Sequence, residues 1–379
     1  MGRVMKPGQT IGILGGGQLG RMMAFAAKPM GYRVAVLEPK TDSPAGQVAD
    51  VEIEASYDDR AGADRMAEAC DVLTYEFENI DAETARHLEN TLYLPQGSQL
   101  LHTAQHRLRE KQAIEAADIK VAPYHQVTSR EELSAAVEQI GVPSVLKTCR
   151  GGYDGKGQVV LKAREEAEAA FETLGGSDGK ELVLEAWIPF QKEISCIVTR
   201  SVHGETGVFP VGENIHVNNV LHQTIVPARI SRFVNEEAIR IAHRLAEHMD
   251  LVGTLAVEMF VTENETVYVN EVAPRPHNSG HYTIEACETS QFEQHIRAVC
   301  GLPLGPARLK QPVVMTNILG EHVEAVTANM EEWSKDHVHL YGKDEAKPGR
   351  KMGHWTVLRE DLQDALDRSA DVWKQYIEK

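Results

Sequence analysis

The sequence has few cysteines, no long apolar run and a deficit of basic charge. Its five cysteines are widely spaced and include no Cys-x-x-Cys pair, so neither a disulfide framework nor a cysteine-based zinc site is indicated. No stretch approaches the ~18 apolar residues that a membrane-spanning helix needs, and the N-terminus lacks the pattern of a signal peptide. We therefore expect free thiols, no membrane association and a cytoplasmic location.

Lysine and arginine number 39 against 56 aspartates and glutamates, which gives a net charge of −17. Proteins that bind nucleic acid non-specifically need a basic surface to displace counterions. The composition therefore argues against a nucleic-acid partner, although a small phosphorylated substrate would need only a few local cations. The length of 379 residues suits two or three domains.

The N-terminal part of the chain alternates between predicted strands and helices. Strands are predicted at 10–14, 33–37 and 72–75, and a helix at 18–30. Alternation of this kind indicates a parallel sheet with helices on its faces. Turn-forming residues at 95–98 mark the end of this first domain.

The rest of the chain changes from helix-rich to strand-rich. Helices are expected at 100–117 and 129–140, the second of them capped by Ser129. A loop dense in glycine at 150–157 then joins two short strands. The remaining predicted elements are strands at 145–148, 158–161, 182–185, 193–199, 208–212, 254–261 and 267–272, and helices at 163–174, 235–249 and 361–377.

Residues 15–20 form a G-x-G-x-x-G pattern after a strand and before a helix. With Glu38 at the end of the second strand, the pattern permits a dinucleotide site and hence a nicotinamide oxidoreductase. The physical basis is broader, because glycines and a helix N-terminus can receive any phosphate, including that of a substrate. A purely structural turn between strand and helix is a third interpretation.

The loop at 150–157 is more specific. Four glycines surround Tyr153, Asp154 and Lys156, and the loop joins two strands, whereas a Walker loop carries Gly-Lys-Ser/Thr at the start of a helix. A glycine-rich hairpin with a lysine suits closure over a triphosphate, with backbone amides and the ammonium group meeting the phosphate oxygens. Lys147, at the end of the preceding strand, could reach the same region. The alternative is a solvated hairpin tip.

Two glutamates are predicted to oppose each other in a later hairpin. If Asn264 and Glu265 are the central pair of its turn, Glu258 and Glu271 face each other across the strands, and like charges in that position destabilise a sheet. A divalent cation would remove the repulsion, and Mg²⁺ is held by one or two carboxylates together with substrate phosphates. Asn270 offers a further oxygen ligand. The alternative is that one glutamate faces solvent.

The segment 273–281 follows this hairpin directly. Two prolines fix its backbone, while Arg275, His277, Asn278 and His281 bring polar side chains to it. A rigid polar loop beside a metal site indicates a wall that binds substrate.

Four sequence blocks, at 15–22, 75–79, 150–158 and 270–281, together resemble those of the 5-(carboxyamino)imidazole ribonucleotide synthases, the ATP-grasp carboxylases of de novo purine synthesis. The blocks occur in family order and span nearly the whole chain. The resemblance implies an α/β protein with an ATP-grasp fold, an N-terminal Rossmann-like pre-ATP-grasp domain and a small C-terminal domain. The implied domains are 1–99 (pre-ATP-grasp), 100–190 (small ATP-grasp subdomain with the phosphate flap), 191–312 (large subdomain with the Mg²⁺ site) and 313–379 (C-terminal segment packing on the ATP-grasp core).

The resemblance also implies a reaction. ATP phosphorylates bicarbonate, the co-substrate, to carboxyphosphate, which then carboxylates the exocyclic amine of 5-aminoimidazole ribonucleotide, and ADP and phosphate are released. Carboxyphosphate hydrolyses readily, so we expect closure of the 150–157 flap to exclude water. The substitution Gly155→Pro should therefore impair turnover more than folding. A homodimer is implied as well.

Site residues follow from the same resemblance. Those implied to bind ATP are Arg107, Lys147, Gly152, Tyr153, Asp154, Gly155, Lys156, Gly157, Gln158, Glu185, Ala186, Trp187, Ile188, Glu193, His216, Asn270 and Glu271. Those implied to bind Mg²⁺ are Glu258, Glu271 and Asn270. Those implied to bind the ribonucleotide are Gln18, Leu19, Glu76, Tyr153, Asp154, Arg275, His277, Asn278, Lys343, Arg350 and Lys351. Those implied to act in catalysis are Lys147, Tyr153, Asp154, Lys156 and Arg275.

Three other functions remain open. Formate-dependent glycinamide ribonucleotide transformylase, or another ATP-grasp ligase, would share the architecture, although its first glycine loop usually carries glutamate where Gln18 stands. A nicotinamide oxidoreductase would use the first loop but would leave the second loop and the paired glutamates without a role. A non-catalytic nucleotide sensor would need neither the metal pair nor the rigid polar wall.

Overall fold

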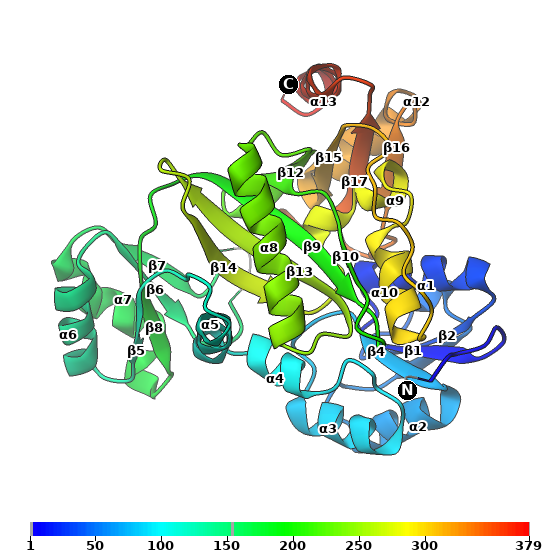
Figure 1. The fold of residues 1–379 in the computed structure, drawn as a ribbon, viewed down its shortest axis with the longest axis horizontal. Coiled ribbons are helices and arrows are strands. Elements are labelled where there is room, and N and C mark those ends of the chain that lie inside the picture. Colours follow the sequence, from blue (N-terminus) through cyan, green and yellow to red (C-terminus); the bar gives the residue numbers. More distant parts are fainter. Residues whose placement is uncertain (1–2, 153–154, 379) are drawn as a thin grey trace.

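The computed structural model describes residues 3–152 and 155–378 (Figure 1). Within these ranges the strands form three sheets: a parallel N-terminal sheet, a small antiparallel sheet, and a large nine-stranded sheet that extends into the C-terminal part of the chain. No helix of the described chain is both long and apolar enough to cross a membrane. The five cysteines are free and buried, as expected.

The N-terminal sheet has the strand order β3-β2-β1-β4 with all neighbours parallel, which confirms the predicted parallel sheet. Its elements are β1 (Thr10–Leu14), α1 (Gln18–Ala27), β2 (Arg33–Glu38), β3 (Val51–Glu54), α2 (Arg60–Ala69), β4 (Val72–Tyr75) and α3 (Ala82–Thr91). After α1 a 3-10 turn leads to Gly31, whose φ of +82° suits glycine and ends the helical segment. β3 has no clear signal in the sequence, because two of its four residues are glutamates.

The helical stretch predicted at 100–117 is helical but interrupted. The segment consists of α4 (Gln99–Ala104) and α5 (Arg107–Ala116). The cause of the break is tertiary: the Gln105 side chain donates to the carbonyl oxygens of Glu78 and Ile80, both at 2.6 Å. These bonds fix the chain at the point where α5 must begin, so the first residue of α5, Arg107, faces the other sheets.

The small sheet has the antiparallel order β5-β8-β6-β7. Its elements are β5 (Tyr124–Val127), α6 (Arg130–Ile140), β6 (Ser144–Thr148), β7 (Gln158–Leu161), α7 (Ala167–Thr173) and β8 (Leu182–Ala186). Ser129 caps α6 by accepting the N–H of Glu132 at 3.2 Å, as predicted. The helix expected at 163–174 is shorter, because a 3-10 turn precedes α7. Both helices cover one face of the sheet and bury Leu133 and Phe171 there (Figure 1).

The large sheet has the order β14-β13-β9-β11-β12-β15-β17-β16, with β10 paired to β9. Its strands are β9 (Phe190–Arg200), β10 (Thr206–Val208), β11 (Gly212–Val217), β12 (Val220–Val226), β13 (Gly253–Thr262), β14 (Val267–Ala273), β15 (Val313–Leu319), β16 (His337–Leu340) and β17 (Lys351–Leu358). The helices of this part are α8 (Arg232–His248), α9 (Thr283–Ala286), α10 (Gln291–Val299), α11 (Val323–Ala328), α12 (Met330–Trp333) and α13 (Leu362–Tyr376). Because β12 pairs with β15, the C-terminal strands continue this sheet.

The predicted strand at 208–212 is also wrong. β10 ends at Val208 and β11 begins at Gly212, and Pro210 lies between them, where it has no N–H to donate to a ladder. Phe209 and Val211 are each only 1% exposed. The apolar run therefore reflects burial against neighbouring elements and not continuous strand pairing.

Helix α10 covers one face of the N-terminal sheet, although it lies some distance along the chain. Phe292 and Ile296 belong to the same buried apolar cluster as Met23 of α1 and Val34 of β2. Figure 1 shows α10 beside α1, above the strands of this sheet. One of the helices that cover the N-terminal sheet, α10, therefore comes from a part of the chain that follows the β13–β14 hairpin of the large sheet.

A buried histidine reinforces this junction. The backbone N–H of Thr254 donates to His295 Nδ1 at 3.1 Å, so the proton of the neutral ring is on Nε2, which lies 2.7 Å from Thr74 Oγ1. Thr74 in turn donates to the side chain of Gln96, whose amide donates to the carbonyl of Pro274 at 3.3 Å. These polar groups join β4, β13 and the loop after β14.

Acid should weaken this junction. Burial lowers the pKa of His295 to about 3, against 6.5 in an exposed histidine. Below pH 6.5, His295 is therefore protonated in the unfolded chain but stays neutral in the folded chain. For each unit by which the pH falls below 6.5, this difference lowers the free energy of unfolding by about 1.4 kcal/mol. In His295→Gln this contribution to the pH dependence should disappear.

Calorimetric unfolding from pH 7.5 to pH 5.5 measures the difference between the two proteins. His125→Gln, a change at an exposed position, serves as the matched control and should keep the wild-type dependence. An unchanged dependence in His295→Gln would contradict the prediction.

Candidate active site

A cavity of about 600 Å³ lies where the three sheets approach one another. Its walls come from the start of α1, the loop after β4, the β6–β7 loop, β8, the β13–β14 hairpin and β17. All four sequence blocks singled out above contribute residues to it. Segments that are far apart in the sequence therefore meet around one space.

A buried ion pair forms the wall on the side of the small sheet. Lys147 Nζ lies 2.9 Å from one oxygen of Glu185, and Lys111 Nζ lies 3.2 Å from the other. Burial disfavours the carboxylate, but Lys147 and Lys111 outweigh this effect and lower the pKa of Glu185 to about 2. Two ammonium groups against one carboxylate leave a local surplus of positive charge, which suits a phosphate group.

Glu258 and Glu271 face each other across the β13–β14 hairpin, which confirms the predicted pairing. The register changes at the next pair, because Met259 is opposite Val269, and Asn270 is left as the extra residue of a β-bulge. Neighbouring side chains of a regular strand point to opposite faces. The bulge lets both Asn270 and Glu271 line the cavity.

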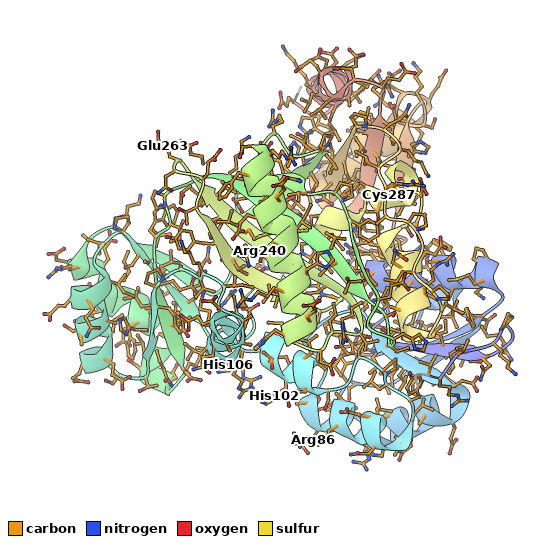
Figure 2. The ribbon with its side chains drawn as sticks, viewed as in Figure 1. Arg86, His102, His106, Arg240, Glu263 and Cys287 are labelled. Carbon is orange, nitrogen blue, oxygen red and sulfur yellow. The ribbon has the colours of Figure 1, made fainter. Side chains whose placement is uncertain are left out.

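The turn of this hairpin differs from the prediction. Val261 pairs with Val267, which centres the turn on Asn264 alone and not on a two-residue pair. Glu265 takes the left-handed conformation, with φ of +60°. Figure 2 shows Glu263 at the outer tip, away from the cavity. The predicted pairing of the glutamates still holds because the bulge adds back the one residue by which the turn was misplaced.

Three carboxyl groups lie close together at this hairpin, and burial and their proximity make two of them harder to ionise. Burial, and after it the charge of Glu271, raise the pKa of Glu258 to about 7. Glu110 of α5 is 3% exposed and accepts the N–H of Val272 at 2.7 Å. Burial and Glu271 raise the pKa of Glu110 to about 8. Opposed carboxylates on the cavity wall, with an amide oxygen beside them, are a donor set that fits Mg²⁺.

Arg107 is the cation nearest to these carboxylates in the described contacts, with Nη1 3.1 Å from Glu271. Burial disfavours its charged form, but Glu271 outweighs this effect, so its pKa is raised. Because Arg107 starts α5, the break between α4 and α5 is what brings the guanidinium to the hairpin.

The wall at 273–281 is held from both sides. Arg275 forms a two-point contact with Glu78, at 2.7 and 3.3 Å. The side chain of Gln291 accepts the backbone N–H of His277 at 2.9 Å and donates to its carbonyl at 2.7 Å. These bonds fix the backbone on either side of Pro276, so the polar side chains of the wall are held in place.

His277 connects this wall to the metal-binding hairpin. Its Nδ1 accepts the backbone N–H of Ser279 at 3.3 Å, and its Nε2 lies 3.1 Å from Glu258. Burial, and after it Arg275, lower the pKa of His277 well below its usual value. The neutral ring therefore carries its proton on Nε2 and donates it toward Glu258.

The first glycine loop binds carboxylates of the protein itself. Glu76 accepts the backbone N–H groups of Gly17 at 2.5 Å and Gly20 at 2.6 Å. Glu38 accepts that of Gly16 at 2.8 Å. Glu38, which a dinucleotide site would use for a ribose, thus faces the loop. This geometry contradicts the nicotinamide interpretation.

Gln18 and Leu19, at the same helix start, line the cavity. Lys343, in the loop between β16 and β17, donates to the side-chain oxygen of Gln18 at 2.5 Å and to the carbonyl of Lys351 at 2.6 Å. Arg350 instead contacts Asp344 at 3.1 Å on the exposed side of that loop. The C-terminal loop therefore reaches the start of α1 through Lys343, not through Arg350.

Domain families match three consecutive parts of the chain. A ribonucleotide synthetase preATP-grasp domain matches residues 8–105, an ATP-grasp domain matches 112–292, and a phosphoribosylaminoimidazole carboxylase C-terminal domain matches 313–368. N5-carboxyaminoimidazole ribonucleotide synthase of Bacillus subtilis is 52% identical over 371 residues, which cover 98% of this chain and 97% of the relative. The chain belongs to the N5-carboxyaminoimidazole ribonucleotide synthases.

Solved structures of this synthase family agree along the whole chain. An N5-carboxyaminoimidazole ribonucleotide synthetase in complex with ADP is 55% identical with a TM-score of 0.95, and each chain is covered completely. The Aspergillus clavatus synthase, in complex with ADP and 5-aminoimidazole ribonucleotide, is 31% identical with a TM-score of 0.91 and coverage of 99% of this chain and 100% of the other. The expected ATP-grasp fold with pre-ATP-grasp and C-terminal domains is thus confirmed.

Most of the predicted site residues of this synthase line the one cavity. They are Gln18, Leu19, Glu76, Arg107, Lys147, Gly152, Gly155, Lys156, Gln158, Glu185, Ala186, Trp187, Ile188, Glu193, His216, Glu258, Asn270, Glu271, Arg275, His277, Asn278 and Lys351. Gly157, Lys343 and Arg350 are not among the lining residues described, and Tyr153 and Asp154 lie outside the described residues. The individual roles remain predictions.

Three charged residues of the site escaped sequence reasoning. Glu78 holds Arg275, Glu110 holds the bulged strand, and Lys111 completes the pair at Glu185. Lys111 had a usable signal, because it lies three residues from both Leu108 and Ile114 and so shares their buried helix face. Glu78 lies within the block 75–79, which marked its neighbourhood but not its contact with Arg275, and Glu110 had no signal, since its partner is distant in the sequence.

Removing the carboxylate between the two lysines should destabilise the fold. Glu185→Gln leaves the ammonium groups of Lys147 and Lys111 buried without a counter-charge, which costs about 3–5 kcal/mol of unfolding free energy. Urea unfolding followed by circular dichroism measures the loss. Glu165→Gln, an exposed position on the same subdomain, should differ from wild type by less than about 0.5 kcal/mol. Equal stability of the two variants would contradict the role given to Glu185.

Proposed function

We propose that the protein carboxylates the exocyclic amine of 5-aminoimidazole ribonucleotide with bicarbonate, using ATP through carboxyphosphate. One observation carries the proposal: the Lys147–Glu185 pair, the opposed Glu258 and Glu271, and the Arg275 wall line the same cavity. Membership of the synthase family and the ADP and ribonucleotide complexes of relatives support it.

The nucleotide is assigned to the side of the small sheet. Lys147 and Lys156 would meet the phosphates as point charges, with amides of the 150–157 loop around them. The backbone at the end of β8, from Glu185 onward, would read the adenine, and Glu193 would bind the ribose hydroxyls. Glu193 lies 3.1 Å from His216 Nδ1, which orients its carboxylate.

Mg²⁺ is assigned to Glu258, Glu271 and the amide oxygen of Asn270. The raised pKa of Glu258 supports this, because two carboxylates that face each other closely need a cation between them to ionise together. Bound there, the ion would supply positive charge that offsets the negative charge of the ATP phosphates during phosphoryl transfer. His277 holds one oxygen of Glu258 and thereby sets the direction of the carboxylate.

The ribonucleotide is assigned to the opposite side, between the start of α1 and the 273–281 wall. Amides of Gln18 and Leu19 stand at a helix N-terminus, which favours a phosphate, while Lys343 brings positive charge to Gln18. Arg275 and His277 would hold the base and its amine against the carboxyphosphate carbon. The carboxyphosphate intermediate requires exclusion of water, which closure of the 150–157 loop over these walls would supply.

Gly155, in the loop assigned to the nucleotide, lies close to a turn of the large sheet. Gly155 has φ of +76°, and a Cβ there would come within 2.6 Å of Asn219, in the turn between β11 and β12. Gly151 has a similar φ of +73° but open space around a Cβ. Alanine at Gly151 would therefore introduce backbone strain alone, whereas alanine at Gly155 would introduce the same strain and a clash with the neighbouring turn.

Gly155→Ala should lower kcat/KM for ATP about 10-fold more than Gly151→Ala does. Both changes carry the same left-handed strain, but only the first displaces the loop from Asn219, at a cost of about 1–3 kcal/mol. Steady-state ADP release measures both variants, and Gly155→Pro should be more severe still. Equal effects of the two alanine variants would show that the contact has no part in turnover.

Loss of one opposed carboxylate should weaken Mg²⁺ binding. Glu271→Gln is expected to raise the Mg²⁺ concentration for half-maximal ADP release by at least about 10-fold, since even an outer partner of a metal ligand is worth that much. Glu263→Gln is the matched control. It makes the same chemical change at the tip of the same hairpin (Figure 2), and Glu263 is not among the residues that line the cavity. The Mg²⁺ assignment fails if both variants need the same Mg²⁺ concentration.

Substrate identity is tested by ADP release with bicarbonate or formate, each combined with 5-aminoimidazole ribonucleotide or glycinamide ribonucleotide. We expect turnover with bicarbonate and 5-aminoimidazole ribonucleotide alone. Turnover with formate and glycinamide ribonucleotide would favour the transformylase. ATP binding without turnover in any combination would favour a nucleotide sensor.

The homodimer implied by the family resemblance is also part of this proposal. Light scattering after size exclusion should give twice the 41.9 kDa of one chain, and a mass of one chain would contradict it. The cytoplasmic location expected from the free thiols remains a prediction.

A further inference from the structure

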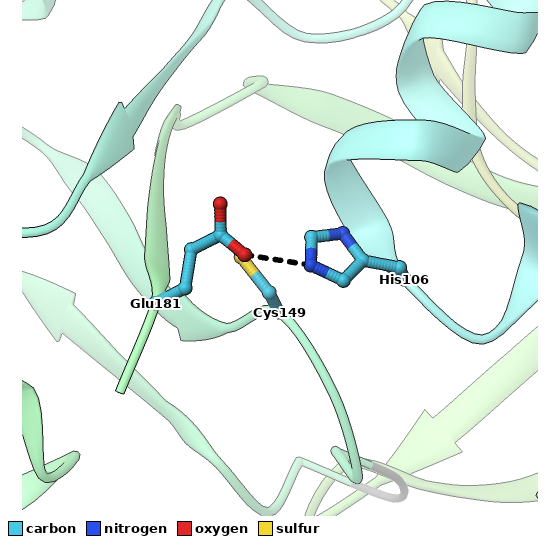
Figure 3. Close-up of side chains that lie close together, drawn as sticks. All are labelled: His106, Cys149 and Glu181. Atoms are coloured by element: carbon cyan, nitrogen blue, oxygen red, sulfur yellow. Dashed lines mark hydrogen bonds and ion pairs between the residues drawn. The ribbon is translucent and has the colours of Figure 1, made fainter. Parts of the chain in front are cut away.

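Three possible metal ligands lie together at the base of the 150–157 loop, outside the roles assigned above. They are His106 before α5, Cys149 after β6 and Glu181 before β8 (Figure 3). Their ligand atoms all lie within 4.8 Å of one another, and no other group of this kind occurs among residues 3–152 and 155–378. The spacing in the sequence gives no sign of them, because each comes from a different element.

The backbone holds the three residues in a fixed arrangement. The N–H of Arg107 donates to the carbonyl of Cys149 at 3.0 Å, and the N–H of Cys149 donates to that of Glu181 at 3.2 Å. Gln126 donates to one oxygen of Glu181 at 2.5 Å, which leaves the other oxygen 2.8 Å from His106 Nε2. A held carboxylate of this kind is typical of preorganised metal sites.

Thiolate, imidazole and carboxylate together are ligands of Zn²⁺ and related ions, whereas Mg²⁺ prefers oxygen ligands alone. We propose that His106, Cys149 and Glu181 bind a borderline-soft divalent cation of the Zn²⁺ type, with water as the fourth ligand. The site is separate from the Mg²⁺ position on β13 and β14. It would fix the residue that leads directly into the loop over the nucleotide.

Binding requires small local changes. The His106–Glu181 hydrogen bond opens, and the Cys149 thiol gives its proton to solvent as sulfur binds the metal. In a neutral His106 ring the proton moves from Nε2 to Nδ1, a buried atom without a hydrogen-bond partner among the described residues. The metal's two positive charges are then matched by the thiolate and the carboxylate.

Access and surrounding charge permit a cation. The Glu181 side chain is 36% exposed, so the site opens to solvent there. Arg107 and Arg150 interact electrostatically with Cys149 and act against a cation. The charge of Arg107 is already paired with Glu271 at 3.1 Å, which limits this effect.

Co²⁺ is the probe, because sulfur ligation gives a thiolate-to-cobalt charge-transfer absorption that oxygen ligands cannot produce. Titration of the full-length protein in a thiol-free buffer should show this absorption saturating at one equivalent of Co²⁺. Glu271→Gln should retain the absorption, which separates the site from the Mg²⁺ position. Cys70→Ser, which changes a buried cysteine on the N-terminal sheet, should retain it as well.

Cys149→Ser should abolish the absorption, and His106→Gln and Glu181→Gln should each weaken Co²⁺ binding by at least about 10-fold. Circular dichroism confirms that each variant is folded, and the three variants together remain informative if one of them is not. The proposal is overturned if wild type shows no thiolate absorption, if the absorption survives in Cys149→Ser, or if neither His106→Gln nor Glu181→Gln alters the affinity.

Discussion

The repulsion between Glu258 and Glu271 is the constraint on which the rest of the site depends. A sheet would normally avoid two carboxylates in one cross-strand pair, and here several other features accommodate them. The bulge at Asn270 adds an oxygen donor on the same side, Arg107 and His277 each contact one of the two carboxylates, and the first turns of α5 are placed to reach the hairpin. The pair is stable only with compensating groups around it, and the reactive cavity is what those groups enclose.

The cavity also depends on how tightly the domains are joined. The large sheet continues through β12 and β15 into the C-terminal strands, and α10 supplies part of the helical cover of the N-terminal sheet. His295 connects these parts through hydrogen bonds that fix its tautomer. The walls of the cavity therefore come from domains that share a sheet or a core, which holds groups from distant parts of the sequence at fixed distances.

Local patterns were sufficient to predict the parallel N-terminal sheet and the cap at Ser129, because each follows from neighbouring residues. The facing glutamates were predicted correctly only because the bulge at Asn270 offsets the misplaced turn. Local patterns failed where a distant contact decides the structure. The helix at 100–117 is broken by bonds from Gln105 to the loop after β4, and two amides of the glycine loop donate to Glu76, a partner that the local pattern did not indicate. Family resemblance, not residue spacing, supplied the substrate and most of the site residues. The roles of Glu78 and Glu110 became visible only in the folded chain, where each meets a partner distant in the sequence.

The cover that α10 gives to the N-terminal sheet has a consequence for synthesis of the chain. Domains usually fold in order as they leave the ribosome, the N-terminal one first. Here β1, β2 and β4 emerge long before α10, and until α10 arrives the apolar surface that it covers, which includes Val34 and Met23, is open to water. The first domain to be made is thus among the last to be completed. Its final packing can form only after the nucleotide-binding domain has been synthesised. The N-terminal domain and the active site are therefore completed at the same stage.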